Sequence, residues 1–208
     1  MPTLIPPVSI DMIEPYSEQQ VIAALVEQLP KECKLYHNFE YISSSENSGK
    51  SAGKKLREGE IDAVILWPEK GLLVLEIKGG EIGYCSDTAR WTTRNRNGCF
   101  IIKDPMSQAR HNMHELISAM ELELNTKLKG SLTHGYAVVF PTTRGNGSLP
   151  HSADTAIVCD QRVLALLVDL SMVRSRAGVE IVNPVHTTSC RSRSYIAPCC
   201  RCLTWCHP

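Results

Sequence analysis

The spacing of apolar residues near the start of the chain predicts an amphipathic helix over residues 17–29. Val21, Leu25 and Leu29 recur at helical spacing, so one side of this helix is expected to be buried. Ser17 stands at its start, where a serine hydroxyl can cap free backbone N–H groups. We therefore expect the chain to open with a helix that packs against a larger element.

After this helix, apolar and polar residues begin to alternate, which is typical of strands. Residues 34–43 alternate and predict a strand, whereas residues 43–58 are polar and rich in Gly and Ser and predict a flexible loop with four basic side chains. Two runs rich in Ile, Val and Leu follow, EIDAVILW at 60–67 and LLVLEIKG at 72–79. Pro and Gly at 68–71 predict a turn, so the two runs form an antiparallel hairpin.

The rest of the chain continues this mixture of strands and helices. Residues 80–104 predict short extended segments separated by polar turns, and 105–127 predict a long helix with one apolar side. The apolar run YAVVF within 130–143 predicts a buried strand, followed by a short strand at 155–159 and a helix at 161–170. Such alternation favours an α/β fold, with a mixed central β-sheet flanked by helices on both faces.

Composition narrows the class of protein further. The 208 residues are 43% hydrophobic and 21% charged, which is ordinary for a globular domain. Twenty-two basic and 22 acidic residues give no net charge, so a strongly basic surface offers no evidence for nucleic-acid binding. The N-terminus has no signal-peptide pattern, and no apolar run approaches the roughly 20 residues that span a bilayer. We expect a cytoplasmic protein that makes no contact with membranes.

The hairpin brings four charged residues together. If its turn centres near residue 69, Asp62 opposes Glu76 and Glu60 opposes Lys78. All four then project from one side of the sheet, with opposed Cβ atoms about 4.5–5.5 Å apart. The simplest alternative is a surface hairpin with a Glu60–Lys78 ion pair worth about 0–1 kcal/mol. The apolar residues on both faces of these strands argue instead that the charges are recessed.

Two opposed carboxylates repel each other unless a cation lies between them. Mg²⁺ suits that place because it prefers oxygen ligands, and the backbone carbonyl of Ile77 would be a further ligand beside Asp62 and Glu76. A lysine next to a metal and a phosphate can orient an attacking water or neutralise charge in the transition state. The pattern therefore predicts a metal-dependent site for phosphate chemistry, in which Lys78 supplies a positively charged side chain beside the metal.

At these residues the chain resembles the nuclease-related domain, a branch of the PD-(D/E)xK nucleases that share the restriction-endonuclease-like fold. The family pattern is a Gly-Glu-hydrophobic-Asp strand, a turn, and a Glu-x-Lys-Gly strand. It is matched by Gly59-Glu60-Ile61-Asp62 and by Glu76-Ile77-Lys78-Gly79. Glu18, Trp91 and the segment DPMSQ ending in Gln108 match as well, so that the resemblance covers residues 15–160. Trp91 is expected to pack in the core.

The resemblance implies a function and a set of residues that perform it. Asp62 and Glu76 would bind Mg²⁺, with Mn²⁺ as a substitute, Lys78 would be the catalytic lysine, and Glu18 and Gln108 would support the site. The implied reaction is hydrolysis of phosphodiester bonds in DNA, with RNA as an alternative substrate. Because members of the family are often joined to helicase or kinase-like domains, a helicase is an expected partner. Two other functions stay open: a non-catalytic binding module, and a hydrolase of another phosphate ester.

Composition changes near residue 170, which predicts a boundary between a nuclease-related domain at 1–170 and a tail at 171–208. Arg, Ser and Cys replace the apolar periodicity there, and five of the nine cysteines lie in the last 19 residues. Their crowded spacing does not match the paired ligands of a structural zinc site. We expect the tail to be poorly ordered rather than to bind zinc.

Overall fold

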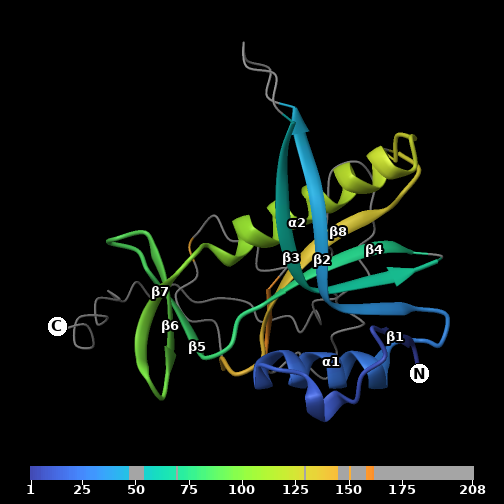
Figure 1. Cartoon of the computed structure of the whole chain (residues 1–208). Coiled ribbons are helices and arrows are strands. Elements are labelled where there is room, and N and C mark those ends of the chain that lie inside the picture. The colour runs from blue at the N-terminus through green and yellow to red at the C-terminus, as the bar shows by residue number, and fades with distance from the viewer. Residues whose placement is uncertain (47–53, 69, 129, 145–149, 151–157, 162–208) are drawn as a thin grey trace, which may run out of the picture.

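The computed structural model describes residues 1–46, 54–68, 70–128, 130–144, 150 and 158–161 (Figure 1). Its elements follow the chain in this order: β1 (Thr3–Ile5), η1 (Ile10–Met12), α1 (Tyr16–Gln28), β2 (Lys34–Glu46), β3 (Lys54–Trp67), β4 (Gly71–Ile77), β5 (Glu81–Cys85), β6 (Arg90–Asn95), β7 (Gly98–Ile102), α2 (Pro105–Glu123), β8 (His134–Phe140) and β9 (Val158–Asp160).

The main sheet has six strands in the order β1-β2-β3-β4-β8-β9. β2, β3 and β4 are antiparallel neighbours, whereas β1, β8 and β9 each run parallel to the strand that they join. The predicted mixed α/β sheet is therefore confirmed, and it is compatible with a restriction-endonuclease-like domain. The predicted hairpin is confirmed as β3 and β4.

The two helices cover opposite faces of this sheet, as Figure 1 shows. Side chains on a strand alternate between faces, so successive residues of β3 and β4 meet different helices. Five residues of these strands pack in one cluster with α1, and they are Ala63, Ile65, Leu73, Leu75 and Ile77. Val64, Leu72 and Val74 pack in a second cluster with α2. The residues of α1 and α2 in these clusters, together with the α1 C-cap Leu29, are Val21, Ile22, Leu25, Val26, Leu29, Met113 and Leu116.

A second, three-stranded sheet lies beside the main one and is formed by β5, β6 and β7 in antiparallel order (Figure 1). Trp91 on β6 is 4% exposed and packs with Ile82, Ala109 and Phe140, which joins this sheet to α2 and β8. The prediction that Trp91 is a packing residue is thus confirmed.

Several predicted boundaries differ from the structure. Residues 43–58 were expected to be loop, but β2 continues to Glu46 and β3 begins at Lys54, because backbone pairing continues through this polar stretch. The helix predicted over 105–127 ends at Glu123. The N-cap of α1 is Pro15 rather than Ser17, which lies in the first turn. The helix predicted at 161–170, apart from its first residue, and the tail at 171–208 lie outside the described residues.

Within the described part of the chain, no helix is both long enough and apolar enough to cross a membrane.

Candidate functional site

The candidate site lies where β3 and β4 stop pairing. Their register runs from Trp67 opposite Gly71 to Ala63 opposite Leu75, as the turn predicts. Beyond this point β4 continues to pair only with β8. The Asp62 carboxylate fills the opening, because its Oδ2 accepts a 2.6 Å hydrogen bond from the Ile77 amide. The two strands therefore present Asp62 and the end of β4 to a common space.

Glu76 is the most deeply buried charged group of the site, with no exposed surface. Its Oε1 forms an ion pair with the Lys78 ammonium, and its Oε2 accepts a 3.3 Å hydrogen bond from the Asn112 amide on α2. The Lys78 side chain is 24% exposed, so its ammonium connects the buried carboxylate to the surface. The Lys78 ammonium therefore has an ion-pair partner and is also accessible to a ligand from solvent.

The carboxylates of the site perturb one another. Burial raises the pKa of Glu76 to about 7, and the nearby Asp62 charge adds to that effect, while Lys78 opposes it. Burial also raises the pKa of Asp62, although the Ile77 hydrogen bond and Lys78 counteract it. Raised carboxylate pKa values mean that the surrounding protein does not fully stabilise the ionised carboxylates. A cation is the natural complement of such a site.

Glu18 joins this cluster from α1. The pKa of Glu18 is raised to about 7. Burial is the main cause, and the negative charges of Asp62 and Glu60 add to it. The first turn of α1 comes this close because Gly79 has no side chain: a Cβ built on Gly79 would lie 2.7 Å from the Ser17 Oγ. The glycine after Lys78 therefore has a steric role, since it admits the helix that carries Glu18.

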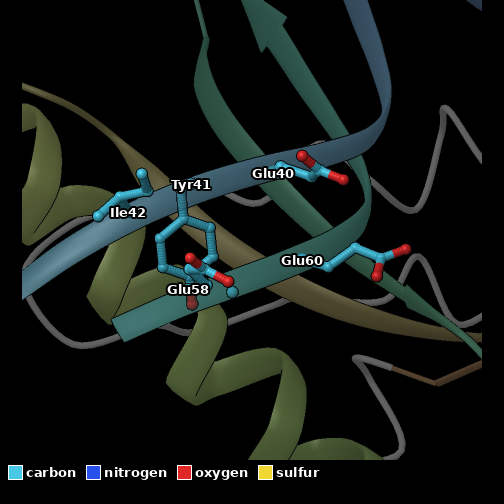
Figure 2. Close-up of a pocket in the computed structure, with 6 residues that line it drawn as sticks. Glu40, Tyr41, Ile42, Glu58 and Glu60 are labelled. Atoms are coloured by element: carbon cyan, nitrogen blue, oxygen red, sulfur yellow. The ribbon is translucent and has the colours of Figure 1, made fainter. Parts of the chain in front are cut away.

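The other motif glycine, Gly59 on β3, also permits a close approach. A Cβ built there would lie 2.3 Å from the Tyr41 ring, which crosses over Gly59 from the neighbouring strand. Tyr41, Gly59, Glu40 and Glu60 line a hollow of about 570 Å³ (Figure 2). Figure 2 shows Glu40 and Glu60 projecting to one side of the adjacent strands β2 and β3.

Glu60 does not take the predicted place opposite Lys78. Its ladder partner is Glu40 on β2, and its side chain is exposed. Lys78, the first residue after β4, forms its ion pair with Glu76 instead of with Glu60. The prediction that Glu60 opposes Lys78 is wrong because the β3–β4 ladder ends at Ala63, before Glu60 is reached, and the alternative Glu60–Lys78 ion pair is absent for the same reason.

α2 supplies a residue that the sequence reasoning missed. The Asn112 Nδ2 donates to the Glu76 Oε2 and to the Glu60 backbone oxygen, each at 3.3 Å, and Asn112 is 7% exposed. Gln108 precedes it by one helical turn and so shares its side of α2, but its side chain makes no hydrogen bond to Glu76 or Lys78. The sequence carries no signal for Asn112, because its burial depends on how α2 packs over the sheet.

α2 begins where it does because of its first residues. The Asp104 side chain accepts hydrogen bonds from the Met106 and Ser107 amides, and Pro105 occupies the first turn, where its missing N–H is not needed. This start sets the register that directs Asn112 toward β4.

The donor set of the site matches a hard divalent cation. No group of three His, Cys, Asp or Glu side chains in the described residues forms a complete ligand cluster. Asp62 and Glu76 nevertheless supply two carboxylates with raised pKa values, and Mg²⁺ sites commonly use one or two carboxylates completed by water and phosphate. The residues present therefore fit such an ion.

Comparison with known families decides which family this site belongs to. The family model described as the nuclease-related domain matches residues 15–141, from the loop before α1 to the end of β8. The chain belongs to the nuclease-related domain family. No curated protein and no solved structure matches it significantly. Membership in this family indicates a nuclease-related function, and the matched residues include Glu18, Asp62, Glu76, Lys78 and Gln108.

Proposed function

We propose that this nuclease-related domain is a Mg²⁺-dependent nuclease that hydrolyses phosphodiester bonds in DNA. The observation that carries the proposal is the convergence of Asp62, Glu76 and Lys78 at the opening between β3 and β4. A buried ion pair beside a second carboxylate of raised pKa is an unfavourable arrangement for stability alone. A site that binds a cation and a phosphate explains why the fold keeps this destabilising arrangement, because the ligands compensate its charges.

The ion would be held by the carboxylates of Asp62 and Glu76 and by the backbone carbonyl of Ile77, with Mn²⁺ as a substitute. When bound, Mg²⁺ supplies a water of lowered pKa and neutralises charge on a phosphate oxygen. The residues of the chain hold this arrangement in place: Ile77 orients Asp62, and Asn112 orients Glu76.

Lys78 and Glu18 would perform the remaining chemistry. The partly exposed Lys78 ammonium is suited to donate a hydrogen bond to a phosphate oxygen or to orient the attacking water. Glu18, with its pKa raised to about 7, is suited to take up or release a proton near neutral pH. Gln108, one helical turn before Asn112, would support the site from α2.

The test is cleavage of supercoiled and linear DNA, and of RNA, with Mg²⁺ or Mn²⁺. Asp62→Asn is the informative variant, since an amide oxygen can still accept the Ile77 hydrogen bond while the charge is lost. Glu40→Gln is the matched control, because Glu40 is exposed and lies in the neighbouring hollow. We expect Asp62→Asn and Lys78→Ala to lose at least about a hundredfold in rate.

The controls decide between the candidate functions. Glu40→Gln should cleave like wild type, and circular dichroism should match for all variants. A folded wild type that binds DNA without cutting it would refute the nuclease and favour a binding module that recruits a helicase. Hydrolysis of a small phosphate ester alone would instead indicate a different phosphoesterase.

A further inference from the structure

The β6–β7 hairpin is a basic segment in a chain with no net charge. Residues 88–103 include four basic residues and no acidic one. Their side chains are all exposed, and they are Arg90, Arg94, Arg96 and Lys103. Positive charge concentrated on one hairpin attracts a polyanion locally even when the whole chain is neutral.

The same hairpin exposes apolar side chains between these charges. Phe100 is 47% exposed and Ile101 is 63% exposed. Phe100 pairs with Thr93, and Ile102 pairs with the buried Trp91, so these four residues share one face of the small sheet. This face is packed into the core at Trp91 and reaches solvent at Phe100.

That face is fixed directly beside the candidate site. The Thr93 Oγ1 donates a 2.7 Å hydrogen bond to the carbonyl of Gly79, the residue after Lys78. Phe100, as the ladder partner of Thr93, lies one strand further out. The next carbonyl, that of Gly80, accepts from the hydroxyls of Thr142 and Thr143. Figure 1 shows the small sheet beside the main sheet, connected to it through the end of β4.

We infer that the β6–β7 hairpin binds an unpaired strand of nucleic acid and leads it to the site at Lys78. Phe100 stacks against a base, and Arg96 with its neighbouring basic residues contacts phosphates. An exposed aromatic ring on one face of an antiparallel hairpin, with Arg96 in the turn next to it, suits single strands, because bases in a duplex cover each other's faces. The inference rests on the proposed nuclease function and adds the kind of substrate that the hairpin recognises.

The test is fluorescence anisotropy of the full chain with a labelled single-stranded oligonucleotide, compared with the duplex of the same sequence. EDTA is present throughout, so binding is measured without cleavage. We expect Phe100→Ala to weaken single-strand binding about tenfold, within the range measured for base stacking, and Phe100→Trp to retain it. Leu122→Ala is the matched control, because Leu122 is 62% exposed at the far end of α2.

Salt dependence tests the role of the charges. Removing one phosphate contact with Arg96→Gln should reduce the slope of log affinity against log salt by about 0.7 for a single strand. Lys31→Gln, an exposed cation after α1, should leave the slope unchanged. Duplex affinity should change much less than single-strand affinity in Phe100→Ala, because stacked bases are not available to the ring.

The outcomes separate this inference from the proposed function. If wild type cleaves DNA but Phe100→Ala binds single strands as tightly as Leu122→Ala does, the hairpin inference is wrong and the nuclease stands. If Phe100 is needed for single-strand binding but wild type never cleaves, the inference stands and the nuclease fails. Loss of self-association in Phe100→Ala, with nucleic-acid binding unchanged, would assign the surface to a second copy of the chain and overturn the inference.

Discussion

The carboxylates of the site repel one another, and Lys78 offsets part of that repulsion. Glu18 and Glu76 each have a pKa raised to about 7, first by burial and then by the Asp62 charge. The Glu76 carboxylate is held in this environment by two neighbouring donors, the Lys78 ammonium and the Asn112 amide. Asn112 brings a donor from a distant part of the sequence, since it bonds to Glu76 across 36 residues and to the Glu60 backbone oxygen across 52.

Replacing Asn112 by alanine should weaken both the fold and the site. Its amide donates to the Glu76 Oε2 and to the Glu60 carbonyl oxygen, and both acceptors would lose that donor. We expect the free energy of unfolding to fall by about 1–3 kcal/mol. Urea unfolding measures this loss, and Ser118→Ala, an exposed change on the same helix, is the control. Equal stability of the two variants would show that the bridge contributes nothing.

Asn112 should also act through Glu76 on catalysis. We expect Asn112→Ala to lower kcat about tenfold with little change in KM, because the residue orients a proposed ligand rather than the substrate. A change confined to KM would instead place Asn112 in contact with the substrate.

At the scale of elements, Gly80 fixes the position of the small sheet relative to β4. It has φ +86°, and a Cβ built on it would lie 2.3 Å from the Thr93 Oγ1 and 2.8 Å from the Arg94 carbonyl oxygen. Gly130 has nearly the same φ, +85°, with nothing within 4 Å of its Cβ position. Substituting these two glycines therefore distinguishes the effect of backbone strain, which both share, from the effect of a steric clash, which only Gly80 has.

Gly80→Ala should destabilise the chain more than Gly130→Ala does. Both variants carry the left-handed penalty of roughly 1–2 kcal/mol. Gly80→Ala must in addition displace Thr93 and the backbone at Arg94, so we expect its free energy of unfolding to fall by about 1–3 kcal/mol more. Chemical denaturation of the two variants measures the difference. Equal losses would mean that the small sheet shifts freely and is not held by this contact.

The elements also show how far the sequence predicts this fold. The β3–β4 register follows from the turn and from apolar residues on both faces, and it is confirmed from Ala63 opposite Leu75 onward. The outer part of β2 and β3 was predicted as loop, because periodicity reports burial and polar strands have little of it. The register pairs Ser43 with Arg57 there, and the polar sequence of both strands carries no hydrophobic pattern.

Of the candidate site, the residues near the hairpin were predictable from the sequence, whereas the contacts that depend on other elements were not. Asp62, Glu76 and Lys78 lie near one hairpin, so strand spacing was enough to bring them together. The partner of Lys78 depended on where β3 and β4 separate, and the alternating pattern of the two runs does not show that their ladder ends at Ala63. Asn112 depends on the register of α2 over the sheet, for which local spacing carries no signal.

At the scale of the whole molecule, the site should make stability depend on pH and on metal. The pKa of Glu76 rises from 4.5 to about 7 on folding, so the folded chain binds more protons than the unfolded chain between these values. This group therefore stabilises the fold at low pH, and its contribution is lost as pH rises through about 7. In EDTA, we expect Glu76→Gln to flatten this fall in Tm between pH 5 and 8, whereas the exposed Glu40→Gln should not.

Mg²⁺ should reverse that trend, because it binds the ionised carboxylates of the folded state. At a hundredfold excess over Kd, a ligand specific for the folded state stabilises it by about 2.7 kcal/mol. Tm should then rise with Mg²⁺ at pH 8, rise much less at pH 5 where protons compete, and not rise with Glu76→Gln. Differential scanning calorimetry measures all three. A Mg²⁺-induced shift of equal size at both pH values, or one retained by Glu76→Gln, would mean that the ion binds elsewhere, because only binding at the buried carboxylates is coupled to their protonation.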